Sequence, residues 1–346
     1  MKCSIFKIIT LLMVTVVLAN NSQGQDLHFS QFFNSPLTTN PANTGFIPDA
    51  NYRIGMNYRN QWSNIVPYKT YSVFGDAQLL RDKWYYGWIG IGGVLLGDNA
   101  GNGILTSNKL YASIAYHQLL GDNSLLTLGF NGGIAMKRID ISKLTFPDQF
   151  NDAYGKWFFD TKLPSGESFA NSSIHYFDLQ AGMNYAYFPT DNIYLNAGFS
   201  VQHLNTPKET FLAGGTNEIG RRYTGFLNAS IKVSPNVIIN PNAYYSNQSK
   251  ASETVLGAWA AYNLSGEGGA FQFLAGAYYR LNDALIPLIG YQLRQWRLMF
   301  TYDVTVSSFN SADKSQGAYE VSLVYLGLYS KLNGHFNKRT YLCPHF

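Results

Sequence analysis

Apolar and polar residues alternate along almost the whole chain, and this period of two constrains the fold more than any single motif. Tyr52, Ile54, Met56 and Tyr58 share one face of a segment whose other face carries arginine, asparagine and glycine. A period of two is the signature of a β-strand. The pattern recurs in about fourteen segments, centred near Met56, Val73, Ile89, Ala112, Phe130, Met183, Ala197, Ala229, Pro241, Trp259, Ala275, Ile289, Phe300 and Leu323. Each segment has about ten residues, the length with which a tilted strand crosses a bilayer.

The composition fits strands whose outer face meets lipid. Only 13% of the residues are charged, whereas a soluble domain has about a quarter. Aromatic residues make up 16%, and outer-membrane barrels use such residues as girdles at the membrane interfaces. The net charge of +4 comes without any basic run, so the sequence gives no support for binding to nucleic acid. The sequence therefore predicts an all-β protein, a transmembrane antiparallel β-barrel of about 14 strands over residues 51–330, in the outer membrane and in contact with its lipid.

The connections between the predicted strands alternate in length. The even-numbered connections, such as 120–124 and 294–295, are short and rich in turn residues, while most odd-numbered ones are longer. The largest of these is 139–171, and a short one near Asn282 is an exception. Outer-membrane barrels have short periplasmic turns and long extracellular loops. The pattern therefore predicts that the odd-numbered connections face outward and that both ends of the barrel domain lie in the periplasm.

The two ends of the chain differ from the barrel in pattern. Residues 1–24 have a positive start, a short apolar run and small residues at the end, and we interpret them as a signal peptide cleaved before Gln25. Residues 25–50 show no periodicity and form a periplasmic or plug segment in this reading; a flexible leader is the alternative. A barrel of this size is too wide for its own side chains to fill. Residues 331–346 would be a periplasmic tail, and Phe346 a candidate partner contact.

Five charged residues of the polar face gather where the last strand must pair with the first. They are Arg53, Arg59, Asp76, Asp303 and Glu320. We expect Arg59 to lie near Glu320 and Asp303, and Arg53 to lie lower, near Asp76. The hypothesis is that these pairs rigidify the closing seam and hold the N-terminal segment. The alternative is a solvated lumen face, where an exposed pair contributes under about 1 kcal/mol.

No pattern points to catalysis, a metal or a cofactor. The six histidines have no metal-ligand spacing with Cys, Asp or Glu. His117 shares a polar face with Ser113, which resembles a nucleophile and base only remotely. Aromatics near strand ends, among them Trp88 and Tyr194, are expected in the girdles. Aromatic residues also occur in the longest connection, where we expect partner contact or plugging: Phe150, Trp157, Phe158 and Phe159.

Several stretches together resemble the PorP/SprF family of type IX secretion system membrane proteins from the Bacteroidota. They are the opening QDLHFSQFFNSPLTTNPANTGF, the strand YRIGMNYRNQW, the segment LTFPDQF, the late pair FTYDVTVSSFN and GAYEVSLVY, and the terminal CPHF. The resemblance runs from Gln25 to the end of the chain. His345 departs from it, since a basic residue such as arginine is expected at that position.

The resemblance implies an architecture and partners, and no catalytic residues. Its members are outer-membrane barrels of the machinery that exports proteins with a C-terminal secretion signal. The expected partners are a secreted adhesin or other type IX C-terminal signal domain, and periplasmic or outer-membrane lipoproteins of the secretion and gliding apparatus. The expected function is a non-enzymatic anchor or scaffold for these partners. A passive or hydrophobic-solute channel is the alternative, and an outer-membrane hydrolase is a more distant one.

Overall fold

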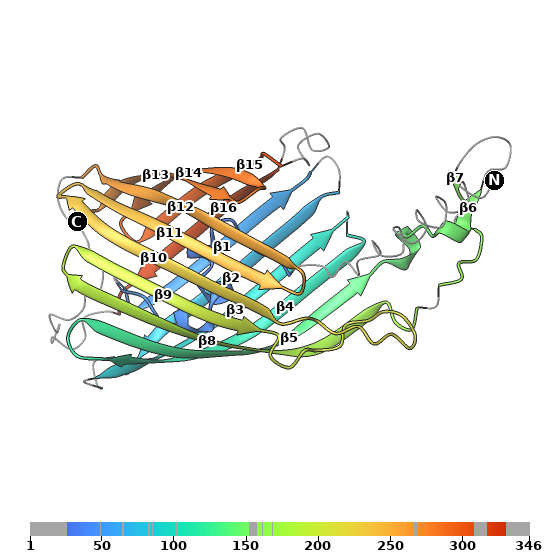
Figure 1. Cartoon of the computed structure of the whole chain (residues 1–346), viewed down its shortest axis with the longest axis horizontal. Helices are drawn as coiled ribbons and strands as arrows, with labels where there is room; N and C mark the ends of the chain where they lie inside the picture. The colour runs from blue at the N-terminus through green and yellow to red at the C-terminus, as the bar shows by residue number, and fades with distance from the viewer. Residues whose placement is uncertain are drawn as a thin grey trace, which may run out of the picture.

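The computed structural model describes residues 26–329 apart from 49, 64–65, 82–83, 85, 102, 152–157, 161, 168, 266–268 and 308–316. Fourteen antiparallel strands form a closed barrel in chain order, with β16 paired to β1 (Figure 1). The predicted signal peptide and C-terminal tail lie outside the described residues. The strands are β1 (Tyr52–Gln61), β2 (Tyr68–Leu79), β3 (Gly87–Ala100), β4 (Leu105–Leu119), β5 (Ser124–Ile139), β8 (Ser173–Thr190), β9 (Ile193–Gln202), β10 (Arg222–Ser234), β11 (Val237–Gln248), β12 (Ala251–Asn263), β13 (Phe271–Arg280), β14 (Ala284–Leu293), β15 (Trp296–Thr305) and β16 (Ala318–Gly327).

The predicted barrel and its number of strands are confirmed, and each of the fourteen predicted centres falls in its own strand. Closure pairs Tyr52 with Gly327 at one end of the seam and Gln61 with Ala318 at the other. Closure satisfies the backbone groups that lipid would otherwise leave unpaired.

Pro241 lies inside β11, pairs with Ala258 of β12, and has no paired residue on β10, because proline lacks the N–H of a ladder bond.

The alternation predicted from the sequence separates the two faces of the wall. Phe130 is 60% exposed and Leu227 62% exposed on the outer face, where lipid would cover them. The neighbouring Asn131 and Thr127 are buried on the lumen face. The apolar outer face is therefore the surface that fits the bilayer core.

The two mouths of the barrel differ in their connections. One mouth carries the turns 120–123, 191–192, 235–236 and 294–295, and the other carries the long connections 140–172, 203–221 and 306–317. The connection between β3 and β4, which the sequence pattern places among the longer ones at residues 97–102, is instead short. β3 continues to Ala100 and β4 begins at Leu105, so only four residues lie between them. The mouth with the long connections is called the outer mouth below, following the rule for outer-membrane barrels.

The longest connection extends away from the wall. Strands β5 and β8 have 16 and 18 residues, and they protrude past the outer mouth in Figure 1. Their connection carries the small hairpin of β6 (Phe150–Asn151) and β7 (Phe158–Phe159). An isolated bridge joins Phe169 to Leu212 of the neighbouring connection 203–221.

The N-terminal segment lies inside the barrel (Figure 1). It contains three short helical turns: η1 (Phe32–Asn34), α2 (Pro36–Thr39) and η2 (Pro41–Asn43). In the described part of the chain, no helix has the length and apolar character needed to cross a membrane. Pro36 and Pro41 stand at the first positions of α2 and η2, where proline favours the start of a helix, and Pro41 also prevents α2 from continuing beyond Asn40.

Candidate functional site

The candidate site is the contact between the lumen wall and the plug, which we define as residues 26–50. The plug has little secondary structure, so most of its backbone polar groups need partners from elsewhere. Wall side chains supply many of them: Ser200 donates to the carbonyl of Thr39 at 2.9 Å, Gln202 to that of Thr38 at 2.9 Å, and Gln78 to that of Ile47 at 2.8 Å. The polar lumen face is therefore matched to one particular occupant.

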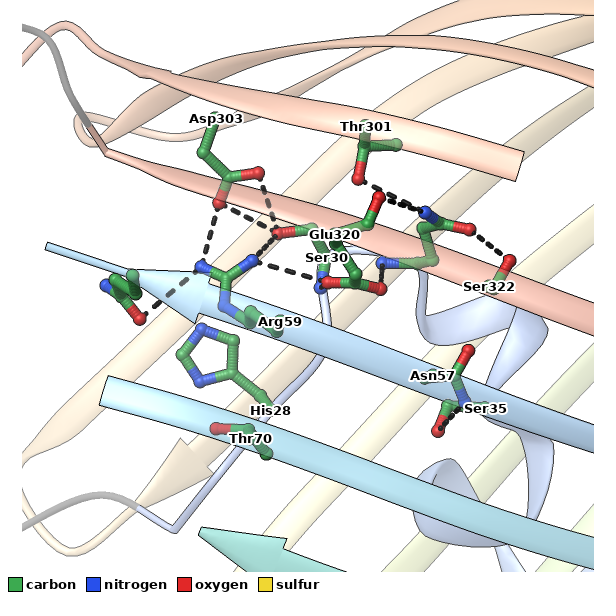
Figure 2. Close-up of polar contacts among 12 residues, drawn as sticks. His28, Ser30, Ser35, Asn57, Arg59, Thr70, Thr301, Asp303, Glu320 and Ser322 are labelled. Atoms are coloured by element: carbon green, nitrogen blue, oxygen red, sulfur yellow. Dashed lines mark hydrogen bonds and ion pairs between the residues drawn. The ribbon is translucent and has the colours of Figure 1, made fainter. Parts of the chain in front are cut away.

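An ion-pair network joins the plug to the seam of the barrel (Figure 2). Arg59 of β1 lies 2.9 Å from Asp303 of β15 and 3.3 Å from Glu320 of β16. Glu320 accepts hydrogen bonds from the backbone N–H groups of Ser30 at 2.8 Å and Gln31 at 3.0 Å. All of these side chains are buried. The same carboxylate therefore contacts both the arginine of the first strand and the backbone of the plug.

Arg280 of β13 completes this seam network from the opposite side. Its guanidinium lies 3.0 Å from Asp303 and donates to the Ser30 hydroxyl at 2.7 Å. It also lies 3.0 Å from Glu253 of β12, whose carboxylate is 3.5 Å from His28 of the plug. Two arginines and three wall carboxylates thus share one buried site with His28 and Ser30 of the plug. A charge left without its partner at such a site would be costly.

A second ion pair lies nearer the inner mouth. Arg53 makes a bidentate contact with Asp76 of β2, with Nη2 2.8 Å and Nε 3.0 Å from its oxygens. The same arginine donates to the carbonyl of Asn43 at 3.2 Å, and Asp76 accepts the N–H of Gly45 at 2.8 Å. The structure thus places all five predicted lumen charges against the plug.

Glycines in the wall make room for the middle of the plug. A Cβ on Gly182 would overlap Oδ1 of Asn40, and a Cβ on Gly129 would overlap the backbone of Pro41 and Ala42. The space lets the Asn40 amide reach the carbonyls of Met183 at 3.0 Å and Phe199 at 3.3 Å. The contact of residues 40–45 with these glycines and with Gly90 of β3 is called the glycine seat below.

One plug residue in the glycine seat requires glycine for its own conformation. Gly45 has a φ of +66°, in the left-handed region, and a Cβ there would overlap Gly90. Its carbonyl accepts a hydrogen bond from Nε1 of Trp88 at 3.1 Å. The backbones of the plug and the wall therefore touch directly at this point.

Asp26 fixes the other end of the plug at the outer mouth. Its carboxylate pairs with Lys109 of β4 and lies 3.3 Å from Nε2 of His203, and its N–H donates to Gln248 of β11 at 2.7 Å. His203 follows β9 and also contacts Asp178 at 3.0 Å. Burial opposes protonation of His203, but the hydrogen bonds and charges of Asp178 and Asp26 outweigh it and raise its pKa above the ordinary value. We call this contact the outer latch.

The wall of β10 to β15 contacts the plug through apolar side chains. Phe32 stacks on Tyr244 with ring centroids 4.9 Å apart and meets Tyr278 edge-on at 5.9 Å, while Phe33 stacks on Trp259 at 6.2 Å. The buried wall residues of this cluster are Phe226, Ile238, Tyr244, Val255, Ala261, Leu274, Tyr278, Ala284, Ile286, Leu288 and Met299. The lumen face is therefore not uniformly polar, because it carries this apolar cluster as well as the charges of the seam.

Two aromatics expected in the girdles lie in the lumen instead. Trp88 is buried and stacks on His117 at 4.6 Å, and Tyr194 is buried against Phe46 of the plug. The plug supplies an apolar surface that the sequence pattern of the strands does not reveal. His117 is bound through both ring nitrogens, to Thr127 at 2.9 Å and to the carbonyl of Thr44 at 2.8 Å, so its ring is engaged in holding the plug.

The predicted partner contacts lie far from the plug. Phe150, Phe158 and Phe159 are 43%, 43% and 47% exposed on the hairpin beyond the outer mouth. Trp157 and Phe346 lie outside the described residues. Within the described part of the chain, no three His, Cys, Asp or Glu residues are grouped as a metal site would require.

Sequence reasoning missed Arg280, His203 and the glycine seat. Arg280 shares a face with Leu274 and Tyr278, so its alternation looks apolar, and His203 lies just past a strand end. The glycines carry no side chain for a pattern to detect. A usable signal was the recurrence of glycine on lumen-facing positions of adjacent strands, as at Gly129 and Gly182, which are paired.

The closed fourteen-stranded wall with an apolar outer band defines an outer-membrane β-barrel. A family model described as type IX secretion system membrane protein PorP/SprF matches residues 21–325, and the chain belongs to this family. No curated protein matches the chain.

The similar solved structures share the barrel fold. The crystal structure of the Ralstonia pickettii toluene transporter TbuX has a TM-score of 0.51 at 11% identity, covering 86% of this chain and 94% of that one. A mutant of the TodX monoaromatic hydrocarbon channel has a TM-score of 0.50 at 11% identity, covering 84% and 93%. At this identity the likeness extends to the fold alone.

Proposed function

We propose that this protein is a non-enzymatic component of the type IX secretion and gliding machinery, which anchors partners on a plugged barrel. The partners would be the C-terminal domain of an exported protein such as a secreted adhesin, or periplasmic and outer-membrane lipoproteins. The observation that carries the proposal is the plug, whose backbone and side chains form hydrogen bonds with the wall at Ser30, Asn40, Gly45 and Ile47. Because the plug occupies the lumen, binding of partners at the surface of the barrel is favoured over passage of a solute through it.

The ion pairs support this role by making the barrel and its plug one unit. Arg59, Asp303 and Glu320 are buried with the plug residue Ser30 among them. Removal of one partner from such a buried pair costs about 3–5 kcal/mol. A rigid, filled barrel suits an anchor that bears load from large surface proteins.

The hairpin beyond the outer mouth is the surface that we assign to the exported partner. Phe150, Phe158 and Phe159 expose rings outside the membrane band, on a connection far longer than the strands require. Long, aromatic connections on a rigid scaffold are typical binding elements. Phe150 and Phe159 meet edge-on at 5.2 Å, so they already form a small apolar surface.

A second candidate function, a hydrophobic-solute channel, is favoured by one observation. The lumen wall of β10 to β15 carries a large apolar cluster, and Phe33 and Trp259 are only partly buried against it. The similar structures include proteins described as a toluene transporter and a monoaromatic hydrocarbon channel. This function requires the plug to leave its seats, whereas the anchor requires it to stay.

Isolation of the protein from native membranes tests the proposed anchor. We expect the wild-type barrel to co-isolate an exported protein with a C-terminal secretion domain, or lipoproteins of the secretion apparatus. The variant F150S/F158S/F159S should lose the exported protein while keeping its heat-resistant mobility. The matched control K143S/K162S changes two exposed residues of the same connection and should behave as wild type. Unchanged co-isolation by the triple variant would contradict the assignment of this surface.

A further inference from the structure

The plug crosses the lumen once, from one mouth to the other. At the inner mouth, the N–H of Asn51 donates to the carbonyl of Gly327 at 2.8 Å, next to the end of β16. At the opposite end, Asp26 lies in the outer latch with Lys109, His203 and Gln248. Residues 26–51 therefore connect the two ends of a barrel whose first strand begins at the inner mouth.

The position of Asp26 is fixed by three separate parts of the wall. Gln248 is the last residue of β11 and precedes the turn 249–250, while His203 immediately follows β9 and begins the connection 203–221. Lys109 lies in the half of β4 that begins at Leu105, beside the connection 101–104. All three connections belong to the mouth that carries 140–172, so the latch is at the outer mouth.

From this path we propose that the processed protein presents its N-terminal end at the cell surface, although its first strand starts from the periplasm. Outer-membrane barrels place their long connections outside the cell, and Asp26 is held among them. The inference depends only on the path of the plug and the orientation of the barrel, and it holds whether the protein is an anchor or a channel.

The path also orders the steps of assembly. The plug residue Ser30 contacts Asp303 of β15, Glu320 of β16 and Arg59 of β1, which are the strands at the closing seam. A plug whose N-terminal end lies at the outer mouth cannot remain attached to the inner membrane through an uncleaved signal peptide. The N-terminal end must therefore be released from the signal peptide before Asp26 can reach the outer latch.

Cross-linking tests the path of the plug without reference to orientation. In a background with Cys3 and Cys343 changed to serine, the pair D26C/Q248C should react with a short bifunctional thiol reagent and shift the mobility of the denatured chain. The matched pair D26C/Q78C places its second thiol in β2 near the inner mouth and should not be linked. Linkage of D26C/Q78C in place of D26C/Q248C would overturn the proposal.

Surface labelling tests the orientation. An epitope inserted between Gln25 and Asp26 should bind antibody on intact cells, as should an epitope between Ser165 and Gly166 of the outer connection. An epitope between Gly121 and Asp122, in the turn from β4 to β5, should bind only after the outer membrane is permeabilised. An N-terminal epitope that follows the pattern of the Gly121 epitope would overturn the proposal, even if the cross-link forms.

Discussion

The two sides of the lumen wall hold the plug by different physics. Strands β1 to β5 and β16 present buried charges and hydrogen-bonding groups, such as Arg59 and Glu320, to the plug backbone. On β10 to β15, the cluster around Tyr244 and Tyr278 presents an apolar surface to Phe32 and Phe33. The charged residues of these same strands, Glu253, Arg280 and Asp303, belong to the polar network at the seam. Polar contacts specify one position through geometry, whereas apolar contacts stabilise through burial with little direction. The comparison teaches that the polar side fixes where the plug sits and the apolar side contributes adhesion.

The largest expected effect comes from reversing the central charge of the polar side. R59E removes the cation of Glu320 and one of the two cations of Asp303, and it adds a further carboxylate beside them. We therefore expect a loss greater than the ~3–5 kcal/mol of simple partner removal. Unfolding of the purified barrel, followed by heat-dependent gel mobility, should shift to a much lower temperature. R221E, at an exposed position in 203–221, is the control. Equal heat resistance of R59E and wild type would show that the seam network does not hold the barrel.

A smaller loss of stability is expected from removing a ring of the plug that packs on the apolar cluster. F32A removes a ring buried against Tyr244 and Tyr278 and should cost about 3–5 kcal/mol in equilibrium unfolding in detergent micelles. The cost should not change with salt, because no charge is involved. F130A, on the lipid face, is the matched control. A strongly salt-dependent loss for F32A would contradict the division between the two sides.

Overfilling the glycine seat should have a more local effect. The methyl group that G182A adds to the wall would overlap Oδ1 of Asn40. Overpacking of this kind costs about 1–3 kcal/mol. We expect the barrel to remain folded while the plug becomes accessible to added protease. G225A is the control, because the nearest atom to its Cβ lies 4.0 Å away. A plug equally protected in both variants would exclude the glycine seat as a determinant of plug position.

The smallest effect is expected from pH at the outer latch. The folded pKa of His203 is raised, so its contribution to stability is complete below the ordinary value of about 6.5 and is lost as pH rises through the folded pKa. The unfolding midpoint of the wild type should fall across that window. H203Q should flatten this part of the profile, because glutamine can still form hydrogen bonds but does not titrate in this range. A profile unchanged by H203Q would refute a charged His203 in the latch.

The outer face of the barrel could be predicted from the sequence, but half of the lumen could not. Lipid imposes one rule on every outward position, so apolar residues at every second position, such as Leu128 and Phe130, locate the strands. Inward positions pack against the plug instead, and the plug has both polar and apolar parts. In β14 the lumen residues Ile286 and Leu288 are as apolar as the outward Leu285 and Ile289, so alternation of polarity is absent there. The lumen side chains depend on tertiary contacts with the plug, and a period of two in the sequence does not predict these contacts.

The charges of the seam could be predicted because strand closure fixes their neighbours. Pairing β1 with β16 in an antiparallel register places Arg59 opposite Glu320. Ser30, Gln31 and Asn40 could not be assigned in the same way, because an aperiodic segment has no register from which to infer contacts.

Single-channel conductance in planar bilayers tests the central claim, that residues 26–50 fill the lumen, most directly. The intact protein should be electrically silent, and a variant lacking residues 26–46 should form stable open pores if it folds, which heat-dependent mobility verifies. A stable open pore from the intact protein, or a folded deletion variant that stays silent, would contradict the account.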